Sequence, residues 1–217
     1  MPMDINIPED LARPTLLEGD GLLPIAVTGH RRLGSREPYN PTNMVATKVK
    51  ELLGEEVTRI VDTNPLGAGF IGISGMALGV DQLYAEVCID MGLPWIAYVP
   101  CLKQWNTWPP KAVARYKDLV SKATDIWLPC GPVPYSFACM QFRNEAMVRD
   151  CTGLLAVWNG VAGGTANCAW FAATTIIRPI RVLDPRFLKD GWVTYRLPES
   201  VTTVMGSATS AQPEVVL

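Results

Sequence analysis

The chain has 217 residues, of which 48% are hydrophobic and 18% charged, and its net charge is −2 with a pI of about 5.5. This length suits one globular domain, and the composition excludes a disordered chain. The acidic balance disfavours nucleic acid as the main partner, because proteins that neutralise phosphates normally carry an excess of basic residues.

The cysteines and the single histidine argue against a metal centre. The six cysteines form no C-x-x-C pair, and His30 is the only histidine. Structural zinc needs closely spaced soft ligands, so we expect six reduced thiols, no metal and no cofactor. The amino-terminal segment lacks the basic end and apolar core of a signal peptide, and no stretch approaches a membrane span. We therefore expect a cytoplasmic protein that makes no membrane contact.

Short apolar runs alternate with longer helical patterns between residues 23 and 198, which predicts a single domain. Residues 1–22 predict an amino-terminal arm and residues 199–217 a flexible carboxyl-terminal tail. The expected strands are 23–29, 70–74, 94–100, 124–129, 153–159 and 178–184. The expected helices are 40–64, with Asn40 as its cap, 77–91, 110–122, 140–150 and 165–177. Apolar strands separated by helices predict an α/β fold: a Rossmann-like open, mostly parallel sheet of five to six strands, with helices on both faces in three layers.

In such a sheet a ligand lies beyond the carboxyl ends of the strands, where the strand order reverses. Four unusual loops follow predicted strands. They are "TGHRRLG" (28–34), "SGMALGVD" (74–81), "PCLKQW" (100–105) and "NGVAGGTAN" (159–167). These loops are therefore the candidates for a binding site.

Two of the loops are rich in glycine. In residues 74–81, Gly75 and Gly79 permit a tight turn that brings the amides at a helix tip close to an anion. Ser74 would add a hydroxyl, and Asp81 would either bind a sugar hydroxyl or cap the helix. The alternative is a strand-to-helix turn that binds nothing. The second loop offers the amides and hydroxyl of Gly163, Gly164 and Thr165, which suit phosphate without a metal.

Arg143 and Asn144 stand in a helix whose other side chains are mostly apolar. The side chain of such an arginine either reaches from the core to the solvent or points into a cleft. Its planar guanidinium matches the oxygens of a phosphate. The alternative is a surface ion pair with Glu145 or Asp150.

The first and third loops supply further candidates. His30, Arg31 and Arg32 follow the first strand, where they would contact a ligand; the alternatives are a structural imidazole and two solvated arginines. Trp105 and Trp108 would form an aromatic wall for a base, or fill the core or an oligomer interface.

These four loops, in this order, resemble those of the SLOG superfamily, and within it the YpsA-like branch. Its relatives include the LOG (lonely guy) phosphoribohydrolases and the DNA-processing protein DprA. The similar stretches are "AVTGHRRLG", "GISGMALGVDQLYAE", "VPCLKQWNTW" and "FRNEAMVRDCTGLLAVWNGVAGGTANCAWFA", all within residues 24–184. The resemblance implies a Rossmann-like fold that binds a nucleotide or nucleotide-derived molecule, often as a dimer or larger homo-oligomer. Its pocket would contain Gly29, Arg31, Ser74, Gly75, Gly79, Asp81, Arg143, Asn144, Gly163, Gly164 and Thr165.

The sequence departs from the catalytic members of this superfamily. LOG enzymes carry a PGGxGTxxE-type motif, whose Glu acts with an Arg to cleave an N-glycosidic bond. Here no carboxylate follows Thr165, and Trp170 stands where a Glu is common in the YpsA-like pattern. Because glycosidic cleavage needs a carboxylate, only Asp81 or Glu86 would be left to act beside Arg143.

The leading hypothesis is a sensor, carrier or sequestering protein for a nucleotide-like signal or metabolite. By analogy, it would act in a phage or bacterial conflict system. The alternatives are a LOG-like nucleotide phosphoribohydrolase and a DprA-like module that binds single-stranded DNA, which the acidic pI disfavours. We expect a nucleotide-like small molecule and further copies of the chain as partners.

Overall fold

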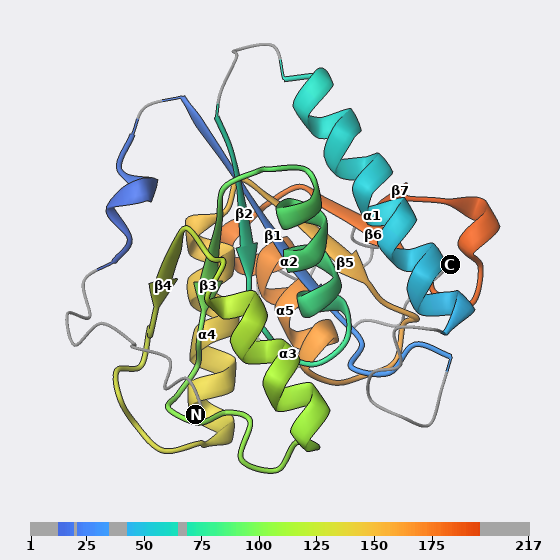
Figure 1. The fold of residues 1–217 in the computed structure, drawn as a ribbon. Helices are drawn as coiled ribbons and strands as arrows, with labels where there is room; N and C mark the ends of the chain where they lie inside the picture. Colours follow the sequence, from blue (N-terminus) through green and yellow to red (C-terminus); the bar gives the residue numbers. More distant parts are fainter. Residues whose placement is uncertain (1–12, 20, 35–42, 65–68, 196–217) are drawn as a thin grey trace, which may run out of the picture.

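A computed structural model describes residues 13–19, 21–34, 43–64 and 69–195. Its centre is a sheet with the strand order β4-β3-β2-β1-β5-β6-β7 (Figure 1). The strands are β1 (Leu22–Gly29), β2 (Gly69–Ser74), β3 (Trp95–Tyr98), β4 (Asp125–Trp127), β5 (Gly153–Val157), β6 (Ile180–Leu183) and β7 (Val193–Thr194). The strands β1 to β6 are parallel, and β7 runs antiparallel to β6.

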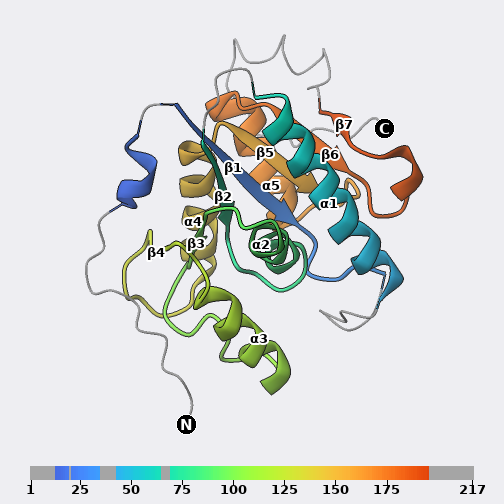
Figure 2. The same cartoon turned by 45° about the horizontal axis from the view of Figure 1, so that its top comes forward.

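Helices cover both faces of this sheet. They are α1 (Met44–Asp62), α2 (Val80–Asp90), α3 (Pro110–Val120), α4 (Phe137–Asp150) and α5 (Gly164–Phe171), which continues into the π-helical segment η2 (Ala172–Ile176). The helices α1, α2 and α3 lie on one face, and α4 and α5 on the other (Figures 1 and 2). The predicted three-layer Rossmann-like fold is therefore confirmed.

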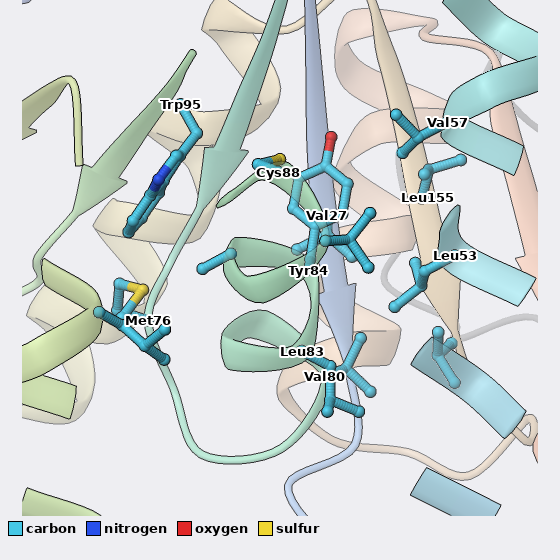
Figure 3. Close-up of a cluster of buried hydrophobic side chains, with 14 of the residues drawn as sticks. Val27, Leu53, Val57, Met76, Val80, Leu83, Tyr84, Cys88, Trp95 and Leu155 are labelled. Carbon is cyan, nitrogen blue, oxygen red and sulfur yellow. The ribbon is translucent and has the colours of Figure 1, made fainter. Parts of the chain in front are cut away.

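The central strands explain why the apolar runs show no polar alternation. In β1, Ile25 and Val27 face the core under α1 and α2, whereas Ala26 faces the core under α4 and α5. Helices on both sides bury both faces of the strand, so successive residues from Leu22 to Val27 are apolar. Figure 3 shows the first of these cores, where the hydroxyl of Tyr84 donates to the backbone oxygen of Ile25 at 2.9 Å.

The boundaries of some elements differ from the expected ones. The sheet gains β7, whose two residues are too few to show a periodic pattern. The cap of α1 is Asn43, whose side chain accepts from the amide of Val45 at 2.9 Å, while Asn40 lies outside the described residues. The helix α4 begins at Phe137 because Ser136 caps it, with its hydroxyl accepting from the amide of Cys139 at 3.1 Å.

The ends of the chain are described only in part. Most of the expected arm and the whole expected tail, residues 199–217, lie outside the described residues, so the domain limits stay predictions. Of the arm, Leu16 and Leu17 pack against the core under α4 and α5, and Arg13 forms an ion pair with Asp150 at 2.7 Å. Within the described ranges, no helix combines the length and apolar character needed to cross a bilayer.

Candidate functional site

The strand order reverses between β1 and β5, which are neighbours in the sheet. From β1 the chain continues through α1 to β2, and from β5 it continues through α5 to β6 on the other side. Beyond the carboxyl ends of these two strands lies a cavity of about 400 Å³, here called the first chamber. It is where an open α/β sheet is expected to bind a ligand.

Nine of the candidate residues line the first chamber, although they come from four separate segments of the chain. They are Gly29, His30, Arg31, Asp81, Arg143, Asn144, Gly163, Gly164 and Thr165. Seven candidates do not line it: Arg32, Ser74, Gly75, Gly79, Glu86, Trp105 and Trp108.

Arg143 is the dominant charge of the first chamber. It lies on α4 and is only 3% exposed, yet its Nε and Nη1 atoms have no hydrogen-bond partner among the described residues. Burial lowers the pKa of its guanidinium, and the nearby Asp81 carboxylate opposes this shift. Because a buried cation needs partners that replace water, the guanidinium is suited to receive an anion.

Asp81 is the only carboxylate among the described residues that line the first chamber. It is 5% exposed, and its Oδ2 accepts from the amide of Ala77 at 3.2 Å and lies 3.5 Å from Nη1 of Arg143. Burial raises the pKa of this carboxyl, and Arg143 opposes the shift. At 3.5 Å the two side chains form an ion pair without a hydrogen bond, so the Nη1 donor of Arg143 is still available to a ligand.

The second glycine-rich turn brings a helix end to the same chamber. Helix α5 begins at Gly164, directly after Gly163, whose φ of 153° favours glycine. No side chain caps this end. The amides of Gly164, Thr165 and Ala166 belong to the first turn and have no partner within the helix. The helix end therefore offers N–H donors and a positive partial charge to an anion.

The first glycine-rich turn acts differently from the expectation. The Ser74 hydroxyl is fully buried, donates to the backbone oxygen of Asp81 at 2.7 Å and accepts from the amide of Met76 at 3.2 Å. The amide of Val80 donates to the backbone oxygen of His30 at 3.3 Å. These bonds, with the one from Ala77 to Asp81, commit the amides of Met76, Ala77 and Val80 inside the protein. We expected the start of α2 to bind an anion. The structure corrects this: the turn supports the chamber, but Ser74, Gly75 and Gly79 do not line it.

The two glycines of this turn are required by close packing. A Cβ on Gly75 would overlap Nη1 of Arg143 and lie 2.9 Å from Oδ2 of Asp81. A Cβ on Gly79, whose φ is 88°, would overlap the backbone oxygen of His30 and lie 2.8 Å from Cα of Arg31. Gly75 thus makes room for the guanidinium, and Gly79 lets α2 approach the loop after β1.

His30 joins the ends of β1 and β5. Its Nε2 accepts from the amide of Asn159 at 3.1 Å, and its own amide donates to the backbone oxygen of Val157 at 3.3 Å. Burial lowers the pKa of the imidazole. An Nε2 atom that accepts a hydrogen bond belongs to a neutral imidazole. His30 lines the first chamber, but this bond favours the structural role over contact with a ligand.

Trp105 and Glu86 lie away from the first chamber. Trp105 packs on Tyr116 with 5.0 Å between ring centroids, which places it with the core under α1, α2 and α3. Glu86 forms ion pairs with Arg115 at 2.6 Å and with Lys50 at 3.5 Å. Neither Trp105 nor Glu86 therefore lines this chamber, and Trp105 takes the core position that was the alternative to an aromatic wall.

A second chamber of about 350 Å³ adjoins the first, and its lining includes Trp108, which was expected with Trp105 to form an aromatic wall for a base. The two chambers share the lining residues Arg31, Ala77, Tyr135 and Met140. The second adds Lys103, Gln104, Asn106, Thr107 and Trp108. Two aromatic side chains missed in the sequence, Tyr135 and Phe137, line the first chamber with exposed fractions of 59% and 74%. Ser136 in the sequence could have indicated them, because a serine cap at this position starts α4 at Phe137 rather than at the expected residue 140.

No protein-family model and no curated protein matches the sequence. The solved structures that are similar to this chain include two DNA processing proteins. DNA processing protein A (DprA) from Streptococcus pneumoniae aligns with a TM-score of 0.53 and 18% identity, covering 91% of this chain and 64% of that one. DNA processing protein A from Helicobacter pylori, which binds single-stranded DNA, aligns with a TM-score of 0.51 and 18% identity, covering 90% and 76%. This chain thus spans 64% of the length of the pneumococcal protein. The similarity shows the Rossmann-like fold that the SLOG resemblance implied, and the YpsA-like branch stays a prediction.

Proposed function

We propose that this Rossmann-like protein binds a nucleotide or nucleotide-derived small molecule by its phosphate in the first chamber. It would hold this ligand as a sensor, carrier or sequestering protein. The observation that carries the proposal is Arg143, a buried cation in the lining of the chamber whose Nε and Nη1 atoms make no hydrogen bond to the described residues. Phosphate oxygens match the guanidinium in charge and geometry.

The surroundings of Arg143 support phosphate over a neutral ligand. The uncapped amides at the start of α5 and the hydroxyl of Thr165 provide donors from the opposite glycine-rich turn. Arg31 adds a second positive charge, and Asp81 is the single negative charge of the described lining. The net positive lining favours an anion that carries one or two charges.

The same lining supports binding without cleavage. Hydrolysis of an N-glycosidic bond requires a carboxylate that stabilises the oxocarbenium-like centre or activates water. Asp81 is held by Ala77 and lies beside Arg143, while Glu86 is paired elsewhere. The wall formed by α4 presents the neutral amides of Gln141 and Asn144 instead. A phosphoribohydrolase activity is thus the less favoured alternative.

The thiols are consistent with action in the cytoplasm. All six cysteines are free, and five of them are buried. Free thiols suit a reducing compartment, where glutathione and thioredoxin keep cysteines unpaired. A role in a phage or bacterial conflict system rests on analogy with SLOG proteins alone.

Isothermal titration calorimetry with AMP and ribose 5-phosphate tests the phosphate site. The double variant Asp81→Asn/Arg143→Met removes both buried charges together, so that neither is left unpaired. We expect it to weaken both ligands by about tenfold or more, since it removes charge-assisted hydrogen bonds. Arg149→Met is the matched control, because Arg149 lies on the same helix but is exposed and paired with Glu145 at 2.8 Å. Equal binding by the double variant and the wild type would contradict the proposal.

Two further assays separate the alternatives. Release of free adenine from AMP, followed by chromatography, would establish a phosphoribohydrolase. Binding of a single-stranded oligonucleotide is the second assay, and the fold shared with DprA and the exposed cations Arg31 and Lys103 justify it. Tight, salt-dependent oligonucleotide binding without nucleotide binding would replace the proposed ligand with DNA.

A further inference from the structure

The second chamber adjoins the first and shares part of its lining. Both are lined by Arg31, Ala77, Tyr135 and Met140, so the two cavities meet at these four residues. The two cavities measure about 400 and 350 Å³, and each falls in the size range of small-molecule sites.

The lining of the second chamber differs in chemistry from that of the first. Its aromatic side chains are Trp108 and Tyr135. Trp108 meets Tyr116 edge-on, at 5.5 Å between ring centroids and an angle of 85°, which fixes the orientation of the indole. Gln104, Asn106 and Thr107 add neutral donors and acceptors, and the described lining contains no carboxylate. Aromatic faces combined with side-chain amides suit a planar heteroaromatic ring.

The backbone around this chamber is strained. The structure has three non-glycine residues with positive φ among those described, and two of them are here: Met76 at 56° and Lys103 at 55°. A hydrogen bond of 3.3 Å from Nε2 of Gln104 to the backbone oxygen of Met76 joins the two turns. Strain of this kind persists only where the surroundings hold it, and it clusters at ligand sites.

We infer that the second chamber is a base-binding subsite, in which Trp108 and Tyr135 stack on the heteroaromatic ring of a nucleotide whose phosphate is bound at Arg143. The inference rests on the proposed function and adds to it the part of the ligand that gives selectivity. It assigns the segment from Lys103 to Trp108, together with Tyr135, to recognition of the base.

Calorimetry with ribose 5-phosphate and with AMP, GMP, CMP and UMP isolates the contribution of the base. We expect the tightest nucleotide to bind about tenfold or more tighter than ribose 5-phosphate, because a stacked base adds affinity of that size. Trp108→Leu, at a residue that lines the second chamber and not the first, should reduce this preference by about fivefold or more while the affinity for ribose 5-phosphate stays within about twofold. Tyr135 lines both chambers, so Tyr135→Leu should weaken the tightest nucleotide more than it weakens ribose 5-phosphate.

The use of two variants and a control distinguishes a loss of base binding from a loss of folding. Trp108 contributes to the core, so Trp108→Leu also lowers the melting temperature, whereas Tyr135 is 59% exposed and its replacement leaves the core intact. Phe187→Leu is the matched control, since Phe187 is an aromatic residue 53% exposed that lines neither chamber.

The outcomes distinguish the two proposals. Equal affinities for ribose 5-phosphate and all four nucleotides, or variants that weaken both kinds of ligand alike, would overturn the base subsite and leave the phosphate site intact. Absence of Arg143-dependent binding for every ligand would overturn both.

Discussion

At Gly75 the space that a side chain would fill is occupied by the guanidinium of Arg143. The orientation of the principal cation of the first chamber therefore depends on a residue that does not line that chamber. The position cannot accept even a methyl group unless Arg143 moves, because close-packed interiors transmit such a change directly.

Gly75→Ala is expected to displace the Arg143 side chain and to weaken ribose 5-phosphate binding by about tenfold. Calorimetry measures the affinity, and thermal unfolding reports any loss of stability. Gly54→Ala is the control, since a Cβ at Gly54 of α1 would meet no atom within 4 Å. Unchanged affinity in Gly75→Ala would show that Arg143 does not bind the phosphate.

Gly79→Ala tests the corrected role of the first glycine-rich turn. The added Cβ would overlap the backbone oxygen of His30, and φ is 88°, so we expect the free energy of unfolding to fall by about 2–3 kcal/mol. Urea denaturation measures this loss. Gly92→Ala has a comparable φ of 65° but an unobstructed Cβ, and it should cost about 1 kcal/mol. Equal losses in the two variants would mean that the contact with His30 is unimportant.

At the scale of elements, Glu56 joins α1 to one edge of the sheet. It is 4% exposed and accepts from Arg59 at 2.6 Å and from Arg181 of β6 at 2.9 Å. Arg181 in turn donates to the backbone oxygen of Trp192 at 3.0 Å and to Thr194 of β7 at 3.1 Å. One buried carboxylate thus organises a helix and two strands.

This network predicts a pH dependence of stability. Burial by itself favours the neutral carboxyl, but the hydrogen bonds from Arg59 and Arg181 hold the pKa of Glu56 below its ordinary value of 4.5. Its stabilising contribution is therefore present above pH 4.5 and is lost as the pH falls through the lowered pKa.

Glu56→Gln should lower the free energy of unfolding by about 2 kcal/mol at pH 7, and the difference from the wild type should shrink below pH 4.5. Urea denaturation at a series of pH values measures it. Glu51→Gln is the control, because its pair with Lys48 is exposed on both sides and contributes little. A difference that does not change with pH would contradict the assignment.

At the scale of the whole molecule, the assembly of the chain stays a prediction. The SLOG resemblance implied a homo-oligomer, and the described surface includes exposed apolar side chains such as Ile177, Phe187 and Val193. Surface of this kind is often covered in an oligomer. Sedimentation velocity should show a dimer or larger species at micromolar concentration, and a monomer at every concentration would contradict it.

The sequence by itself determined the fold and the position of the cavity. The apolar runs of β1 and β5 required a sheet buried on both faces, and glycine-rich or basic loops followed the strands whose carboxyl ends meet. Arg143, an arginine set among apolar residues of its helix such as Met140 and Met147, was identified from the sequence, and it lines the first chamber.

Only the tertiary structure decided which polar groups remain available to a ligand. Ser74 and the amides near Gly79 have partners inside the protein, and one of those partners is the backbone of His30 in a distant segment. Likewise, Trp105 and Trp108 both pack against the core, and of the two only Trp108 also lines the second chamber. The physical reason is that periodicity fixes secondary structure and its buried faces, whereas hydrogen-bond satisfaction depends on contacts between segments far apart in the chain.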